Sequence, residues 1–106
     1  MRRKELKEKV ARCKAFSHSA MRSQWRYGIT IKYRQYKILC ERIKNKQSAE
    51  FLWELTSTRA VWLIEHRVES LFLAAIWDSK SELIVTFLPI EALRKFVSES
   101  SKTGVV

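Results

Sequence analysis

The spacing of the apolar residues changes near residue 48, and this change limits the chain to a mixed fold. Before it, apolar side chains recur every three or four residues, as on one face of a helix. From residue 50 on they alternate with other side chains, as in strands that bury one face. A chain of 106 residues fits one domain around a single modest core. The pattern therefore predicts a one-domain α+β fold over residues 1–106.

Two helices are expected before the change in spacing. Residues 3–14 carry a narrow apolar stripe, which also suits a basic helical arm that orders on a partner. The helical pattern continues or restarts over residues 16–27 and ends at Gly28, a residue that suits a helix end. A second helix is expected over residues 31–46, with Thr30 as its N-cap. The expected core positions of these helices, including two reduced thiols, are Cys13, Tyr33, Tyr36, Leu39, Cys40 and Ile43.

Four antiparallel strands in a meander are expected after the change. Their predicted ranges are 50–55, 59–65, 70–77 and 82–88. The third is apolar on both faces, which indicates a central position. A short amphipathic helix over residues 90–98 and a frayed tail over residues 100–106 complete the chain. The predicted fold is two N-terminal helices packed on a four-stranded antiparallel sheet, with a short C-terminal helix.

The basic residues are concentrated in the first half of the chain. Residues 1–47 hold fifteen Lys and Arg and three Glu, whereas residues 48–106 hold six basic and eight acidic side chains. The halves therefore carry charges of +12 and −2. This asymmetry predicts that one side of the molecule faces an anionic partner: nucleic acid, an anionic membrane surface or an acidic protein. A solvated basic surface without a partner is the alternative.

A triplet of potentially catalytic side chains lies in the same basic half. His18, Arg22 and Arg26 follow one another at intervals of four, which places them on one face of the predicted helix. Imidazole suits a general base near neutral pH, and guanidinium suits a phosphate or the phosphorane formed from it. The triplet therefore suits either cleaving or holding a phosphodiester. Alternatively, His18 lies on the surface or hydrogen-bonds a backbone carbonyl.

Further side chains are candidates for contact with nucleic acid. Trp25 is placed either in the core or, within this basic stretch, against unpaired bases. His66 and Arg67 follow a predicted strand, where they present a phosphate contact or belong to a solvated hairpin loop. Thr86 is expected on the same strand face as Ile84, as a catalytic hydroxyl or as a plain strand residue. The basic candidates for phosphate contact are Lys14, Lys32, Arg34, Lys37 and Arg67.

Other function classes find little support. Two His and two Cys show no ligand spacing, and no Gly-rich phosphate loop is present, so neither a metal nor a cofactor is expected. No apolar run reaches membrane-spanning length, and the basic start leads into an amphipathic helix, so a cytoplasmic protein is expected. The first predicted strand, with Phe51, Trp53 and Leu55, leaves room for a homodimer formed by edge pairing.

The segment from Ser17 to Thr30 reads S-H-S-A-M-R-S-Q-W-R-Y-G-I-T. It resembles the opening of small His/Arg domains in the barnase, colicin D and RelE-like ribonuclease assemblage, S-x-H-A-x-x-R-x-x-x-R-G-I-T. The usual alanine is shifted by one residue, and Tyr27 is an extra residue before Gly28. The helix-helix-four-strand order extends the resemblance over residues 16–89.

The resemblance implies a metal-independent endoribonuclease or a toxin-like RNA-binding module. His18 would be the base, Arg22 and Arg26 would bind phosphate, and Thr86 matches a position where such domains often carry a small hydroxyl residue. Two alternatives from the charge alone remain. One is a nucleic-acid-binding protein without catalysis, and the other is a basic interaction protein that binds an acidic partner such as an antitoxin or a host protein.

Overall fold

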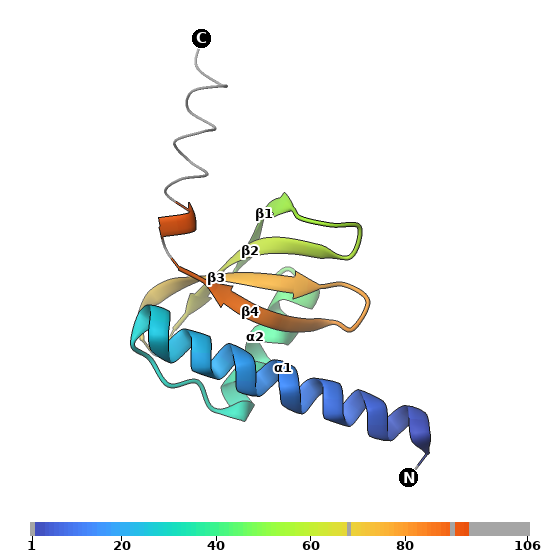
Figure 1. Cartoon of the computed structure of the whole chain (residues 1–106). Helices are drawn as coiled ribbons and strands as arrows, with labels where there is room; N and C mark the ends of the chain where they lie inside the picture. The colour runs from blue at the N-terminus through green and yellow to red at the C-terminus, as the bar shows by residue number, and fades with distance from the viewer. Residues whose placement is uncertain (1, 68, 90, 94–106) are drawn as a thin grey trace.

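A computed structural model describes residues 2–67, 69–89 and 91–93 of the chain (Figure 1). Its strands form one antiparallel sheet in the order β1-β2-β3-β4, with each strand beside its neighbour in sequence. Residues 91–93 are helical, whereas residues 90 and 94–98 of the predicted C-terminal helix and the predicted tail at 100–106 lie outside the described residues. This arrangement confirms the α+β fold. The elements are α1 (Arg3–Tyr27), α2 (Tyr33–Lys44), β1 (Ala49–Glu54), β2 (Arg59–His66), β3 (Leu71–Asp78) and β4 (Leu83–Leu88).

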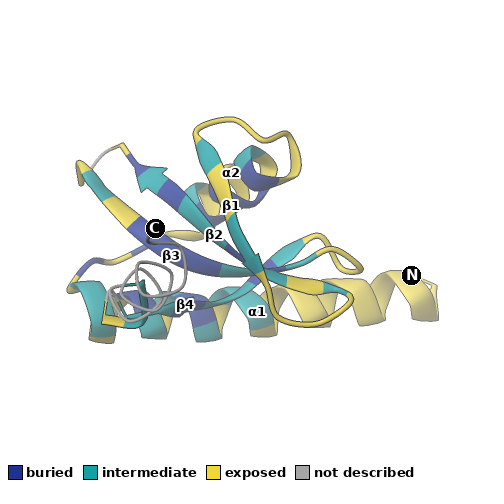
Figure 2. Ribbon diagram, turned by 90° about the horizontal axis from the view of Figure 1, so that it is seen from above, coloured by how far each residue is buried: buried dark blue, intermediate teal, exposed yellow. Residues whose placement is uncertain are grey.

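Helix α1 runs without interruption through both predicted helical segments. It ends at Gly28, whose φ of 68° lies in the left-handed region that glycine adopts without steric cost. The Gly28 N–H donates to the Gln24 carbonyl at 3.0 Å. The N-terminal half of α1 extends beyond the sheet, and its residues are exposed (Figure 2). Leu6 and Val10 are 52% and 42% exposed, so these residues of the narrow apolar stripe lie outside the core.

Helix α2 begins later than predicted, because an extended segment precedes it. Ile29 and Ile31 lie in this segment and are buried, and a helical turn there would remove them from the core. Lys32 occupies the N-cap position. The prediction of Thr30 as N-cap is therefore wrong. Its hydroxyl donates to Gln24 Oε1 at 2.9 Å instead, which ties the segment to α1.

The main core lies between α2 and one face of the sheet. Tyr36, Leu39, Cys40 and Ile43 of α2 are buried, as predicted. Buried sheet residues join them in one apolar cluster, namely Ile64, Leu73, Ala75, Trp77, Ile84 and Phe87. Strand β3 is buried on both faces, which confirms its central position. Two predicted core residues are wrong: Tyr33 is 41% exposed and Cys13 is exposed, because both border an open cavity between the helices.

Helix α1 runs alongside β4, on the side of the sheet where β4 has no neighbouring strand (Figure 1). Its side chains hydrogen-bond to the backbone of that strand. The Ser19 hydroxyl donates to the Ile84 carbonyl at 3.2 Å, and Arg26 Nη1 donates to the Phe87 carbonyl at 2.7 Å. An edge strand left open exposes unpaired backbone groups to any other chain. Helix α1 therefore closes one edge of the sheet, while β1 forms the other.

The Tyr27 hydroxyl joins α1 to two strands at once. It donates to the Leu88 carbonyl of β4 at 2.6 Å and accepts the Ala74 N–H of β3 at 3.0 Å. Burial raises the pKa of this phenol, so the hydroxyl keeps its proton over the neutral range. The last turn of α1 is thereby fixed to the ends of β3 and β4.

Replacing Tyr27 with Phe removes the bridging hydroxyl, so the Ala74 N–H and the Leu88 carbonyl each lose their hydrogen bond to it. We expect the free energy of unfolding to fall by about 1–3 kcal/mol. Urea unfolding followed by circular dichroism measures it. Tyr33→Phe is the matched control, because the exposed Tyr33 hydroxyl makes no hydrogen bond with the described residues. Equal stabilities of the two variants would contradict the bridging role.

Candidate functional site

His18, Arg22 and Arg26 lie along one flank of α1, each partly buried. Because α1 is a single regular helix, successive members of the triplet are turned by about 40° around its axis. The fully buried stripe of α1, marked by Ser19 and Ser23, lies beside them and faces the sheet. The triplet therefore borders the contact between α1 and β4.

The three side chains of the triplet have different roles. The Arg26 guanidinium is held on the Phe87 carbonyl, so one of its N–H groups serves the fold. The guanidinium carbon of Arg22 lies 5.2 Å from the Trp25 ring centroid, within the range of a cation–π contact. His18 makes no hydrogen bond or ion pair with any described residue. His18 and Arg22 thus remain free to meet a ligand, whereas Arg26 is partly committed.

Trp25 lies on the surface of α1 and is 66% exposed. The interpretation of this residue as part of the core is therefore wrong. Helical spacing places it away from the buried stripe, and the Arg22 guanidinium lies against its ring. An exposed indole beside a guanidinium offers a flat surface for stacking a base.

Thr86 does not share a face with Ile84, contrary to the prediction. Ile84 pairs with Trp77 and Thr86 pairs with Ile76, so two steps along β4 correspond to one step along β3. Val85 is the extra residue of this β-bulge. The bulge turns Ile84 to the α2 side of the sheet and Thr86 to the other side. Strict alternation cannot predict such an insertion.

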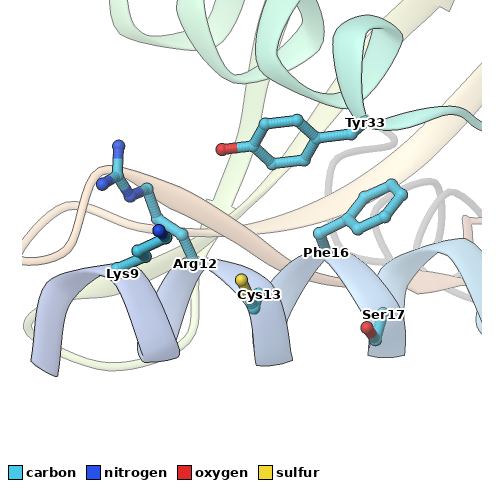
Figure 3. A pocket seen from close by; sticks show the side chains of 6 residues that line it. All are labelled: Lys9, Arg12, Cys13, Phe16, Ser17 and Tyr33. Atoms are coloured by element: carbon cyan, nitrogen blue, oxygen red, sulfur yellow. The ribbon is translucent and has the colours of Figure 1, made fainter. Parts of the chain in front are cut away.

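A cavity lies between α1 and the start of α2 (Figure 3). Its volume is about 400 Å³. Tyr33 points from α2 towards Arg12 on α1, with Phe16 beside its ring (Figure 3). The Phe16 and Tyr33 rings meet edge to face, with centroids 5.2 Å apart. We call this cavity the α1–α2 pocket; it is lined by Lys9, Arg12, Cys13, Phe16, Ser17 and Tyr33.

The α1–α2 pocket combines cations with aromatic surface. Lys9 and Arg12 line it from α1, and no carboxylate is among its lining residues. Lys37 lies next to it, with its Nζ 5.9 Å from the Tyr33 ring centroid. This combination suits a phosphate next to an unpaired base. Lys37 was predicted as a contact, whereas Lys9, Arg12 and Tyr33 were missed because their juxtaposition depends on how α2 packs across α1.

The triplet and the α1–α2 pocket occupy different sides of α1. His18 and Phe16 are separated by about 160° around the helix axis. One small ligand therefore cannot reach both. Of the other predicted contacts, the exposed residues Lys14, Lys32 and Arg34 lie on the helices or just before α2. Arg67 belongs instead to a second cavity, with His66.

His66 was predicted in a solvated hairpin loop, and the structure places it elsewhere. It ends β2 and is only 4% exposed, while Arg67 beside it is exposed. His66 shares a face of the sheet with Ile64 and pairs with Leu71, so its ring belongs to the layer between the sheet and α2.

Comparison of the chain with protein-family models, with curated proteins and with solved structures returns no match. Within the described ranges, no helix is long and apolar enough to cross a membrane. In this part of the chain, no group of three or more His, Cys, Asp or Glu side chains lies close enough together to hold a metal ion. The resemblance to small ribonuclease domains therefore rests on the motif at residues 17–30 and on the order of the elements.

Replacing Arg26 with Met tests whether the hydrogen bond of this side chain stabilises the fold. Because the Phe87 carbonyl loses a charged donor, we expect the free energy of unfolding to fall by about 1–3 kcal/mol. Arg22→Met removes the same charge four residues away and no hydrogen bond, so its stability should stay near that of the unchanged protein. Thermal or urea unfolding of the two variants makes the comparison. A loss in Arg22→Met as large as in Arg26→Met would refute the assignment.

Proposed function

We propose that this protein is a toxin-like module that binds single-stranded RNA through its two helices. The α1–α2 pocket is the observation that carries the proposal, because it places Lys9, Arg12 and the exposed face of Tyr33 around one cavity. In this proposal a base enters against Tyr33, and the neighbouring phosphate lies between Lys9 and Arg12.

The distribution of charge supports an extended anionic ligand. Residues 1–47 carry a charge of +12, and they form both helices and the segment between them. The half of α1 that extends beyond the sheet is exposed on all sides, so its cations are open to a phosphate backbone. The only acidic residue that α2 contributes is Glu41. The sheet half, with a charge of −2, serves as the scaffold.

Exposed aromatic side chains favour single strands over duplex. Unpaired bases stack on aromatic rings, whereas the stacked pairs of a duplex do not offer their faces. Tyr33 and Trp25 are 41% and 66% exposed, and each has a cationic side chain against its ring. Trp25 and the α1–α2 pocket, which Tyr33 lines, lie on different sides of α1. The two rings would therefore hold different nucleotides of one RNA strand.

The binding proposal predicts a large loss of affinity when the α1–α2 pocket is altered. In Tyr33→Ala we expect affinity for a short single-stranded RNA to fall by the equivalent of about 1–3 kcal/mol, the usual contribution of one stacked base. Charge reversal at Lys32, Arg34 and Lys37 should abolish binding, and affinity should fall steeply with salt. Fluorescence anisotropy measures the affinity of both variants and the dependence of affinity on salt.

Two controls make this experiment decisive. Arg59→Gln removes one positive charge from β2, together with the ion pair of Arg59 with Asp78 at 3.5 Å, and should leave affinity nearly unchanged because Arg59 lies on neither helix and does not line the α1–α2 pocket. His18→Ala should also bind normally, because His18 does not line the α1–α2 pocket. Equal losses in Arg59→Gln and Tyr33→Ala would reject the pocket. Nuclease-resistant capture of a polyacidic protein, without RNA binding, would favour the acidic-partner alternative.

RNA cleavage is the second candidate function, favoured by the free imidazole of His18 beside Arg22 on α1. In this reaction the base takes the proton of a ribose 2′-hydroxyl, whose oxygen attacks the adjacent phosphorus and expels the 5′-oxygen of the next nucleotide, which takes a proton from water to leave as a 5′-hydroxyl. Arg22 would stabilise the charge on the phosphate oxygens. No metal takes part in such a step.

The cleavage candidate predicts activity on RNA in the presence of EDTA, with 2′,3′-cyclic phosphate ends among the products. His18→Ala should lower the cleavage rate by about 100-fold or more, as expected for loss of a general base. Gel electrophoresis and mass spectrometry of a labelled RNA measure both. Undiminished cleavage by the His18→Ala protein would exclude this residue as the base, while the binding proposal would be unaffected.

A further inference from the structure

A second cavity lies between α2 and the end of β2. Its volume is about 130 Å³, several times the share of about 30 Å³ that one water occupies in the liquid. Ile38 and Leu39 provide its apolar wall. The polar residues that line it are Gln35, Arg42, His66 and Arg67. We call it the His66 pocket.

The imidazole of His66 carries an unpartnered donor. Its Nδ1 accepts the Glu69 backbone N–H at 3.2 Å, which requires that nitrogen to be unprotonated. The proton of the neutral ring therefore lies on Nε2. This Nε2 is shielded from solvent and has no hydrogen-bond partner in the described structure. A buried donor without an acceptor destabilises the fold, so an acceptor bound in the pocket would remove that penalty.

Two guanidinium groups lie around the same pocket. Arg42 is held by three backbone carbonyls, those of Gln47, Ser48 and Glu65, at 3.3, 3.1 and 2.6 Å. Three bonds use three of its five N–H groups and leave two for a ligand. Burial lowers the pKa of Arg42, and the charge of Arg67 lowers it further.

Arg67 and Gln35 add further donors. Arg67 Nη2 donates to the Ser48 hydroxyl at 2.9 Å. The Gln35 carbonyl oxygen accepts the Lys32 N–H at 3.0 Å, which leaves its amide N–H groups for the pocket. Neither Arg42 nor Arg67 forms an ion pair with a carboxylate in the described part of the chain. The pocket therefore offers free N–H donors from Arg42, Arg67, Gln35 and His66, and no carboxylate lines it.

From this geometry we propose that the His66 pocket is a binding site for a phosphate group with free oxygens, either inorganic phosphate or a terminal phosphomonoester. Arg42 and Arg67 neutralise the charge, and the His66 Nε2–H and the Gln35 amide donate to the remaining oxygens. Because Nε2 is shielded from solvent, binding requires the side chains that line the pocket to shift and expose it. The residues that line the pocket offer no carboxylate to a cation.

This site goes beyond the proposed binding of an RNA strand and does not depend on it. Tyr33 of the α1–α2 pocket and Gln35 of the His66 pocket lie about 160° apart around α2. No residue lines both. Failure of one proposal therefore leaves the other intact.

The test follows the His66 ring by NMR in the full chain. We expect inorganic phosphate, added at constant ionic strength, to shift the Nε2 resonance in a saturable way, whereas chloride should not shift it. Arg67→Gln should weaken phosphate binding about tenfold, which corresponds to about 1.4 kcal/mol. Arg59→Gln removes an equal charge from the other end of β2 and should bind phosphate normally.

A second measurement distinguishes the source of the phosphate. A short RNA with a 5′-monophosphate is compared with the same RNA carrying a 5′-hydroxyl. Tighter binding of the phosphorylated RNA, lost in Arg67→Gln, identifies a terminal phosphomonoester as the ligand. Equal binding of the two RNAs, together with a saturable response to phosphate, identifies inorganic phosphate. The absence of any Nε2 response to phosphate, or equal effects of Arg67→Gln and Arg59→Gln, would overturn the site.

Discussion

The contact between α1 and β4 is the interaction on which the rest of the structure depends. Ser19, Arg26 and Tyr27 satisfy backbone groups of an edge strand that has no further strand beside it. Buried carbonyls need such donors, and a helix backbone cannot provide them because its own N–H groups are already bonded. The side chains of one helix face therefore replace a fifth strand. This contact also fixes where the basic part of α1 leaves the sheet.

Much of the fold followed from periodicity, because burial on one side imposes a repeat of two on strands and of 3.6 on helices. The four strands, their order and the central place of β3 were predictable for this reason. The start of α2 was not, since Ile29 and Ile31 are equally compatible with a helix until the core that receives them is known. The β-bulge at Val85 has no sequence signal, so the side on which Thr86 lies was mispredicted.

The candidate sites were less predictable than the fold. Spacing along one helix was enough to place His18, Arg22 and Arg26 on one flank, but it did not show that Arg26 bonds to Phe87, a residue far along the chain. The α1–α2 pocket depends on the approach of Tyr33 to Arg12, which only helix packing determines. His66 stood next to a charged residue in a predicted turn, and no local pattern indicated that its ring is buried.

The two pockets on either side of α2 have a consequence for how the protein responds to mixed ligands. A helix with its side chains is about 10–12 Å across, and effects at that distance without shared partners are usually additive. Occupants of the two pockets would therefore contribute separate free energies. Helix α2 would separate the two sites without transmitting the effect of binding from one to the other. An RNA strand long enough to fill both pockets would have to bend around it. For such a ligand, reach and flexibility would limit avidity more than the strength of either contact.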